Sequence, residues 1–362
     1  MAADASAVAN DVTAIGYQAL TANTDSGSNN TAVGSYALSN NTTGSENTAM
    51  GKAALGDSTT GAYLTAVGSG AMAAAVTGNS NTAIGYQALK SNTTGTRNTA
   101  AGKDALYSIT TGTDNVAVGS GALYSATTQH ENIALGASAG LNCTTSQNVF
   151  IGGEGCGDAV TTGSECVFIG AFAGTAVTDG SGNVLIGPSA GSAIAGSSNY
   201  NTCLGKDTGS LIGTGDNNLC LGYQANVNSI NNNNQVQLGN SSIEWLRCAQ
   251  STINTFSDRR DKKDIVDSID GLNIINAIKP RKFTWQSRKP DARDGSTQLG
   301  FIAQEIDEVL GDKNDYIRMV DKSNPDSLQI GEARLIPIFV KAIQELSAEN
   351  TALKSRLDAA GL

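Results

Sequence analysis

A closely spaced repeat limits how this chain can fold more than any other feature. Fourteen glycines recur at intervals of 16 to 18 residues, each preceded by a small or apolar residue. They are Gly16, Gly34, Gly51, Gly68, Gly85, Gly102, Gly119, Gly136, Gly152, Gly170, Gly187, Gly205, Gly222 and Gly239. Low-complexity sequence does not hold a period this closely. A unit of about 17 residues cannot bury one face alone, so the units are expected to stack on one another.

Each unit predicts one short β-strand. Around its glycine the unit reads N-[TV]-A-[VIL]-G-x-x-A-[LG], for example over residues 30–38. Apolar or β-branched residues two positions apart are typical of a strand, and glycine then allows the chain to turn. The sequence therefore predicts a mainly β fold, a parallel β-solenoid of about 14 coils over residues 11–240. Stacked at about 4.8 Å per coil, these units would form a rod roughly 60 Å long.

Asparagine stands directly before the predicted strand in most units. The positions are Asn30, Asn47, Asn81, Asn98, Asn115, Asn132, Asn148, Asn183, Asn201 and Asn218. Stacked amides of successive coils can form a hydrogen-bond ladder along the axis. Asparagine also suits a turn without any ladder. The fixed position relative to the strand favours the ladder.

Two positions of the unit exchange large and small residues along the chain. In the first seven units the residue two before the glycine is Ala, and the residue four after it is Leu or Met. From the ninth unit the first position is mostly larger, as at Phe150 and Phe168, and the second is mostly smaller, as at Gly174. Dense packing resists unbalanced volume changes. We therefore expect the two positions to fill one shared space, within a coil or across a subunit interface.

Composition and charge argue against several classes of function. Only 5% of the residues are aromatic, fewer than the core of a globular enzyme usually holds. Residues 1–250 hold 6 Lys and Arg against 15 Asp and Glu, so nucleic acid is not an expected partner. The sequence contains neither a long apolar run nor a secretory signal, which predicts folding in a cytoplasm without membrane insertion.

Histidine and cysteine usage predicts no metal, cofactor or disulfide framework. The single histidine, His130, lies in a loop between units, where we expect a surface role. The six cysteines form no CxxC pair. Cys203 and Cys220 stand where other units have Ala, so we expect them to be small buried apolar residues.

The character of the sequence changes near residue 250. Residues 251–362 are densely charged, with 17 Lys and Arg against 18 Asp and Glu. They contain "NTFSDRRDKKDIVDSIDGLNIINAIKPRKFTWQ" at 254–286, "LGFIAQEIDEVL" at 299–310 and "LIPIFVKAIQELSAENTALKSRL" at 335–357. These blocks, in this order, resemble the C-terminal intramolecular chaperone and self-cleaving peptidase domain of phage endosialidases and tail fibres. The glycine-centred repeats resemble the head repeats of trimeric autotransporter adhesins and the shafts of phage tail fibres.

The resemblance implies a domain that templates trimerisation of the upstream fibre and then cuts itself off. It assigns the cut to Ser257, with Lys262 as its dyad partner, in a motif with Phe256 and Asp258. We expect cleavage of the peptide bond between residues 256 and 257. Cleavage of the bond between residues 257 and 258 remains the alternative. Part of the family also uses a histidine upstream of "GFIAQE", which this chain lacks. Cleavage by Ser and Lys alone, slow cleavage and loss of cleavage are the alternatives.

The chemistry of a Ser–Lys pair sets a geometric condition. A serine hydroxyl needs a base, and a lysine can be that base only when it is neutral. Residues five apart do not meet within one straight helix or strand. Either the chain bends between Ser257 and Lys262, or the lysine comes from a neighbouring subunit. The alternative is a serine that caps a helix, followed by a solvated charged run.

The last segment predicts a helix with an apolar heptad seam. Its residues follow a spacing of 3 and 4 and are Ile336, Phe339, Ile343, Leu346, Asn350, Leu353 and Leu357. An asparagine at an a position is a device that fixes register and oligomeric state. The seam favours an oligomeric bundle, and the alternative is a single amphipathic helix packed on its own domain.

Together these features predict a homotrimeric viral tail fibre or spike that adsorbs to a host cell. Its parts would be an N-terminal segment (1–10), the β-solenoid shaft (11–240), a junction (241–256) and a small α+β or helical chaperone domain (257–362). Expected partners are its own copies, other tail or baseplate proteins, and a host surface receptor, for which a polysaccharide is one candidate. The protein would be assembled in the host cytoplasm and reside in the virion.

Two other functions remain as alternatives. The first is a tailspike depolymerase whose carboxylates line one face, with Glu131, Glu154, Asp158 or Glu165 as candidates. The low aromatic content argues against a strong carbohydrate groove in the solenoid. The second alternative is a bacterial trimeric surface adhesin, against which the missing secretory signal and membrane anchor argue.

Overall fold

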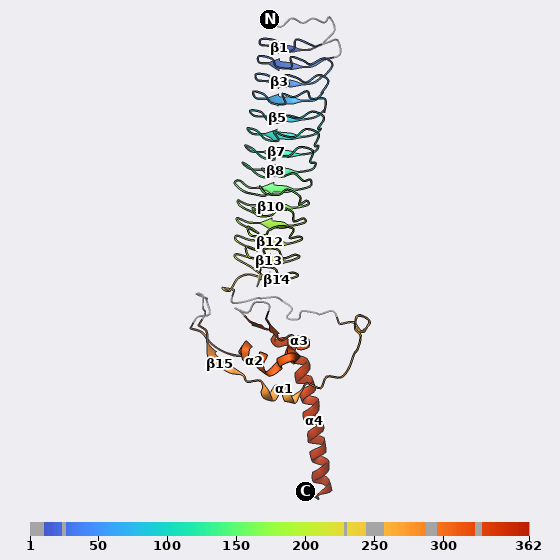
Figure 1. Ribbon diagram of the computed structural model, residues 1–362, viewed down its shortest axis with the longest axis vertical. Helices are drawn as coiled ribbons and strands as arrows, with labels where there is room; N and C mark the ends of the chain where they lie inside the picture. The colour runs from blue at the N-terminus through green and yellow to red at the C-terminus, as the bar shows by residue number, and fades with distance from the viewer. Residues whose placement is uncertain are drawn as a thin grey trace. The chain divides into compact units, whose positions relative to one another are not determined.

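The chain forms two compact units, Met1–Asn240 and Ser241–Leu362, each with its own apolar core (Figure 1). The computed structural model describes residues 11–23, 27–227, 230–243, 257–286, 295–322 and 328–361. Within these residues, none of the helices combines the length and the apolar character that a membrane span needs.

The first unit is a parallel β-solenoid, as predicted. Fourteen three-residue strands, one from each repeat, form a single sheet in chain order, so the chain completes 13 coils between the first strand and the last. Neighbouring strands pair in parallel and in register, as Thr31 does with Thr48. The strands are β1 (Thr13–Ile15), β2 (Thr31–Val33), β3 (Thr48–Met50), β4 (Thr65–Val67), β5 (Thr82–Ile84), β6 (Thr99–Ala101), β7 (Val116–Val118), β8 (Ile133–Leu135), β9 (Val149–Ile151), β10 (Val167–Ile169), β11 (Val184–Ile186), β12 (Thr202–Leu204), β13 (Leu219–Leu221) and β14 (Val236–Leu238).

The glycine after each strand is required by the backbone. Gly102 has a φ of +141°, and a Cβ there would lie 2.5 Å from the carbonyl oxygen of Gly119 in the next coil. Gly34 has the same relation to Gly51. Neither this conformation nor this space admits a side chain. The repeat period therefore follows from direct backbone contact between successive coils.

The strands point their middle residue inward, and in the first eight strands that residue is alanine, whereas β9 to β11 have Phe150, Phe168 and Leu185 there. The middle residue, such as Ala32 or Ala66, is fully buried, whereas the residues on either side of it are partly or largely exposed. Ile15 is 61% exposed and Ile84 is 47% exposed. Because the interior of each coil is narrow, the large residues at the first and third strand positions face outward. The periodicity alone did not indicate which face is buried.

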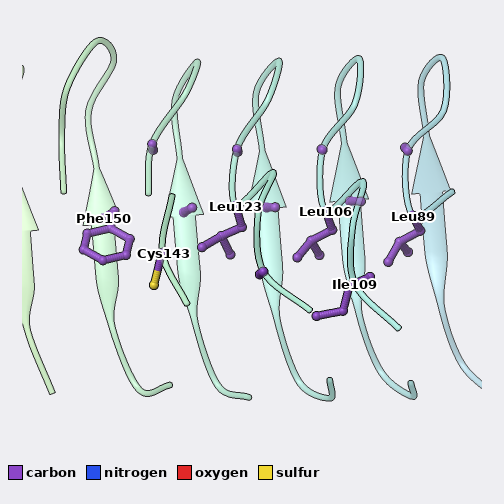
Figure 2. Packing of buried hydrophobic residues seen from close by; sticks show 14 of the residues in the cluster. Leu89, Leu106, Ile109, Leu123, Cys143 and Phe150 are labelled. Atoms are coloured by element: carbon purple, nitrogen blue, oxygen red, sulfur yellow. The ribbon is translucent and has the colours of Figure 1, made fainter. Parts of the chain in front are cut away.

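The predicted exchange of large and small residues is confirmed, and the shared space lies inside a coil. A Cβ at Gly174 would lie 2.5 Å from the ring of Phe168 in the same coil. In the transitional coil, a Cβ at Gly140 would lie 2.5 Å from Phe150 and 3.1 Å from Leu123. Figure 2 shows the leucines of the earlier coils giving way to Phe150. Phe168 thus fills the interior of its own coil, whereas the transitional coil holds only Ala134 and Gly140 at these positions and is filled by Phe150 of the next coil.

Backbone conformation adds a second reason for the exchange. The position four after the repeat glycine is left-handed, with a φ of +49° at Leu38, +51° at Leu106 and +63° at Gly174. Left-handed backbone costs a leucine roughly 1–2 kcal/mol and costs glycine far less. The coils that carry glycine there place their bulk on the strand and avoid this strain.

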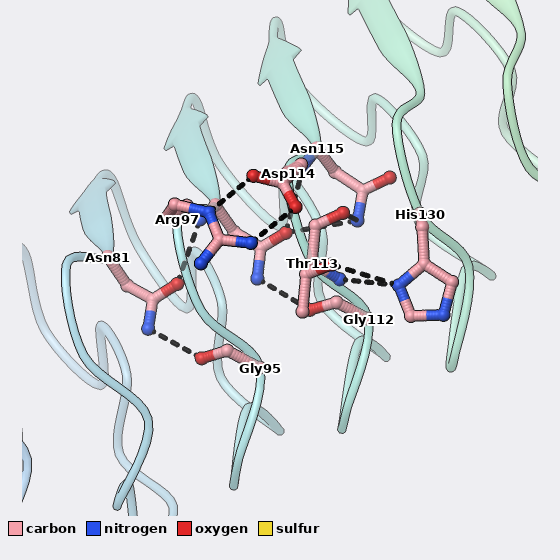
Figure 3. A network of polar contacts seen from close by, with 9 residues as sticks. Asn81, Gly95, Arg97, Gly112, Thr113, Asp114, Asn115 and His130 are labelled. Carbon is pink, nitrogen blue, oxygen red and sulfur yellow. Dashed lines mark hydrogen bonds and ion pairs between the residues drawn. The ribbon is translucent and has the colours of Figure 1, made fainter.

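The asparagine ladder is also confirmed, although it runs mainly from side chain to backbone. The N–H of Asn98 donates to Oδ1 of Asn81 at 2.9 Å, and Nδ2 of Asn81 donates to the carbonyl of Gly95 at 2.7 Å. The N–H of Asn115 repeats the first contact on Asn98 at 3.1 Å (Figure 3). A direct bond between amides joins Asn115 to Asn98 at 3.0 Å. All ten ladder asparagines are at most 1% exposed.

One cysteine takes a place in this ladder. Cys166 stands where most coils have asparagine, and its Sγ donates to the carbonyl of Gly180 at 3.2 Å. That carbonyl lies 14 residues ahead, the same offset as from Asn81 to Gly95. Burial raises the pKa of the Cys166 thiol, so it keeps the proton that it donates.

The described cysteines are free and buried: Cys143, Cys156, Cys166, Cys203 and Cys220. The expectation that Cys203 and Cys220 are small buried apolar residues is confirmed, since both are fully buried and pair in register on β12 and β13. Burial raises the pKa of Cys156 to about 11. The sixth cysteine, Cys248, lies outside the described residues.

The second unit is a small mixed α/β domain that ends in a long helix. Its core joins the side chains of Ile274, Ile278, Ile306, Leu310, Met319, Val320, Leu335 and Ile338. The elements in chain order are η1 (Arg259–Asp261), α1 (Leu272–Ala277), β15 (Arg281–Thr284), β16 (Thr297–Gly300), α2 (Ala303–Leu310), η2 (Gly311–Lys313), α3 (Asn314–Ile317), β17 (Val320–Asp321), β18 (Gln329–Ile330), η3 (Glu332–Arg334) and α4 (Leu335–Ala359).

The shared space inside the coil predicts a rescue between two substitutions. Phe168→Ala should cost about 3–5 kcal/mol through the cavity it leaves. Gly174→Leu alone should cost about 1–3 kcal/mol by overpacking. In guanidinium unfolding, the double variant should lose less free energy of unfolding than the two single variants lose together, because the leucine fills the cavity.

A mismatched pair of substitutions provides the control for this comparison of single and double variants. Phe168→Ala combined with Gly209→Leu, two coils further along, should show no rescue. Additive losses in the matched pair would contradict a shared space.

Candidate functional site

Ser257 and Lys262 lie in contact within one chain. Nζ of Lys262 donates a hydrogen bond to Oγ of Ser257 at 2.5 Å. Between them the chain bends through η1. Asp258 caps this turn, because its carboxylate accepts the N–H of Arg260 at 2.8 Å and pairs with the Arg260 guanidinium at 2.6 Å. Within one chain a bend therefore brings the two side chains together, and the residue that caps the turn is Asp258 rather than Ser257. A lysine from a neighbouring subunit stays the other prediction.

The electrostatics of this pair define what it can do. The Arg260 guanidinium lowers the pKa of the Asp258 carboxyl, which keeps the cap charged. Ser257 and Lys262 are both exposed. In the observed contact the lysine donates, whereas a general base must be neutral and accept the serine proton. Loss of water around the amine favours its neutral form. Phe256, the residue before the serine, lies outside the described residues.

The comparison with known families points to the same segment. Residues 257–314 match the family described as the chaperone of endosialidase. The match begins at Ser257, includes Lys262 and ends at Asn314, so this chaperone-family segment contains the contact between the two side chains. No curated protein and no solved structure matched the chain.

A buried carboxylate ties two parts of the chaperone-family segment together. Asp270 is 4% exposed and accepts hydrogen bonds from Nζ of Lys313 and the hydroxyl of Tyr316. The hydrogen bond from Lys313 is the main cause that lowers the pKa of Asp270, followed by that from Tyr316. Sequence reasoning missed this contact, because its partners lie 43 and 46 residues further along the chain.

The start of α1 is held by the long C-terminal helix. The N–H of Leu272 donates to Oε2 of Glu345 on α4 at 2.7 Å. A helix N-terminus has unpaired N–H groups, and a carboxylate is a favourable acceptor there. A Cβ on Gly271 would lie 2.7 Å from the Glu345 carboxyl carbon, so the glycine allows this approach. The family segment is thus fixed to α4.

The predicted apolar seam of α4 is exposed, whereas another stripe packs on the domain. Leu335, Ile338 and Ala342 are buried against the core. The start of α4 thus packs on its own domain, as the single-helix alternative expects, but it does so through residues other than the seam. The seam residues that remain exposed, at 41–67%, are Ile336, Phe339, Ile343, Leu346, Leu353 and Leu357. Asn350 is exposed as well. The pairing of this seam in a bundle stays a prediction.

The carboxylates considered for a depolymerase occupy different positions of the coil. Glu131 and Glu165 directly precede a ladder position, whereas Glu154 and Asp158 follow a repeat glycine. Glu131 accepts a hydrogen bond from Gln147 at 3.2 Å. Across the described ranges no group of three or more His, Cys, Asp and Glu side chains is placed to hold a metal ion.

His130 has the surface position that the sequence predicts. It is exposed, and its Nδ1 accepts the N–H of Thr113 in the preceding coil at 3.1 Å (Figure 3). Beside it, Arg97 and Asp114 form a two-point ion pair between coils at 2.6 and 2.8 Å. These contacts support the stacking of neighbouring coils.

The Asp270 contacts predict a pH-dependent stability of the second unit. A carboxyl whose folded pKa is lowered stabilises the fold above its unfolded pKa, about 3.9, and loses this contribution as the pH falls through the folded value. Asp270→Asn should therefore destabilise the unit by about 2–3 kcal/mol at pH 7, and the difference from wild type should shrink below about pH 4. Hydrogen exchange of α1 and α2 amides in the full chain measures this effect.

Asp315→Asn, at an exposed position of α3, is the matched control and should leave the exchange unchanged. An Asp270→Asn variant with wild-type protection at pH 7 would contradict the assignment.

Proposed function

We propose that this chain is a homotrimeric tail fibre or spike of a virus, which attaches the virion to a receptor on the host cell surface. In this proposal the β-solenoid is the shaft, and residues 257–362 template its assembly. Other tail or baseplate proteins hold the fibre on the virion. The observation that carries the proposal is that one chain joins a repetitive β-solenoid to a segment of the endosialidase chaperone family.

The outward face of the solenoid sheet supports association with further copies. Each strand places a residue outward directly before the repeat glycine, and most of these residues are large and apolar. Soluble monomers rarely expose a continuous apolar patch on this scale. The most exposed members are Ile15, Met50, Ile84, Val118, Leu135, Leu204 and Leu238.

The α4 seam is a second uncovered apolar surface on the same chain. A heptad seam is buried by other helices of a bundle, and closed symmetric assemblies place the same surface of each copy at the interface. A second and a third copy of this chain would cover both the seam and the strand face. A partner with a different sequence would have to match two unrelated surfaces.

Sedimentation of the intact chain tests this trimer. In a Ser257→Ala background the chain should stay uncut, and the mass of the assembly should be three times the 36.9 kDa of one chain. Adding Ile343→Asp should lower the associated mass, because a carboxylate in an apolar seam loses its water without a partner. Ser355→Asp, at an exposed position of α4 outside the seam, should leave the trimer unchanged. A monomeric Ser257→Ala protein would overturn the proposal.

Self-cleavage is the chemistry that we propose for Ser257 and Lys262. Oγ of Ser257 attacks the carbonyl carbon of Phe256, while neutral Lys262 takes the hydroxyl proton. Lys262 then gives this proton to the Ser257 nitrogen as the 256–257 C–N bond breaks. Water hydrolyses the resulting ester, which yields a Phe256 carboxylate and a new amino terminus at Ser257. No histidine takes part in this scheme.

Intact-mass measurement tests the cleavage. Wild-type protein should separate under denaturing conditions into fragments 1–256 and 257–362. Ser257→Ala and Lys262→Ala should remain full length, whereas Lys263→Ala, the matched control, should be cut like wild type. Cleavage that persists in Lys262→Ala, or a wild-type trimer that stays full length, would refute the Ser–Lys pair. A fragment that begins at Asp258 would move the cut to the 257–258 bond.

A further inference from the structure

We propose that one edge of the solenoid binds a neutral oligosaccharide. The first four coils form a groove of about 510 Å³ at this edge. Its polar lining consists of Gln18, Thr21, Tyr36, Ser39, Asn40 and Asp57. Binding sites for small molecules combine a hollow of this size with a few polar groups that fix orientation.

Small residues in two columns of the repeat create the groove. The side chains two and five positions after the repeat glycine lie along the same edge. In the third and fourth coils these positions hold Ala53, Gly56 and Ala73. The earlier coils have larger side chains there, such as Tyr36 and Gln18. The groove is therefore a local feature of the sequence and is not repeated in every coil.

The polar groups of the groove are oriented by contacts between coils. Nδ2 of Asn40 donates to Oδ1 of Asp57 at 3.0 Å, which holds a carboxylate and an amide side by side on the surface. The hydroxyls of Thr21 and Ser39 donate to carbonyls of the next coil, at 3.1 and 3.0 Å. Their oxygen lone pairs therefore remain available as acceptors. This set of acceptors suits a ligand that is rich in hydroxyl donors.

A fixed aromatic ring stands at the same groove. Tyr36 is 40% exposed, and its ring meets that of Tyr17 edge to face, with centroids 5.4 Å apart. An aromatic ring that neighbours hold in place offers a flat apolar surface at low entropic cost. The C–H face of a sugar ring matches that surface, while its hydroxyls reach the polar groups beside it.

Beyond the groove, the column five positions after the glycine carries two tyrosines, in the sixth and seventh coils. Tyr107 and Tyr124 are stacked with centroids 5.0 Å apart, and Lys90 lies 5.1 Å from the centre of the Tyr107 ring. The groove itself spans four coils, roughly 15 Å at about 4.8 Å per coil, which holds a few sugar units rather than a single one.

The charge of the groove selects the class of sugar. Asp57 is the charged side chain in its lining, so a uronic or sialic acid would meet a like charge there. Neutral hexoses and N-acetylhexosamines meet no such repulsion. This inference rests on the proposed function, because a receptor-binding fibre is where a sugar site would act.

Binding of the purified full-length protein to an array of neutral and acidic bacterial oligosaccharides tests the proposal. Wild type should bind neutral members, and Tyr36→Ala and Asp57→Ala should each weaken this binding at least tenfold. Tyr223→Ala removes a tyrosine of similar exposure from the thirteenth coil and should bind like wild type. Sedimentation and circular dichroism of every variant establish that the fold is retained.

Different outcomes separate the groove from the proposed function. Three results would overturn the sugar site. Wild type would bind only acidic members, wild type would bind none, or both groove variants would bind as tightly as wild type. A protein that forms trimers and adheres to bacterial cells, with no array binding, would leave the proposed function standing. A protein that binds neutral sugars as a monomer would support the sugar site and contradict the proposed trimeric fibre.

Discussion

The close contact between successive repeat glycines is the constraint on which the solenoid depends. Each of these glycines lies against the backbone of the next coil, with no room for a Cβ at Gly102 or Gly34. This contact fixes the coils at strand spacing and leaves a narrow interior. In the earlier coils the interior holds an alanine and one larger side chain, such as Ala32 and Leu38. In a later coil it holds Phe168, which packs against Gly174. The first and third residues of each strand have no place inside, so the large ones among them face outward.

The same regularity creates a problem of register. Strands that all read Thr-Ala-Val or a close variant can pair with the wrong neighbour at little cost in energy. Parallel pairing over many coils also folds slowly and leaves apolar surface exposed meanwhile. The coils that depart from the pattern limit such slips. Leu64 and Cys166 interrupt the asparagine ladder, and Phe150 begins the second packing arrangement. A template at one end of the chain would fix the register of the remaining coils.

The features that the sequence predicted are those set within one repeat. The period, the strand before each glycine and the exchange between Phe168 and Gly174 all involve residues a few positions apart. Contacts between distant residues could not be predicted in this way. The bond from Lys313 to Asp270 spans 43 residues, and the groove beside Tyr36 depends on which small residues stack in neighbouring coils. For Ser257 and Lys262 the spacing left two geometries open, and the capped turn at Asp258 shows how a bend brings the pair together within one chain.

The proposed assembly and the proposed cleavage depend on the same physical condition, the removal of water. The Lys262 amine is exposed to water and lies within hydrogen-bond distance of the Ser257 hydroxyl. A base role needs a neutral amine, and removal of water is one of the few ways to favour it. The exposed strand face and the exposed α4 seam are surfaces that further copies would bury. If the proposed assembly also excluded water from Lys262, the proposed cleavage would follow trimerisation, and the chaperone-family segment would be released only after the coils had formed.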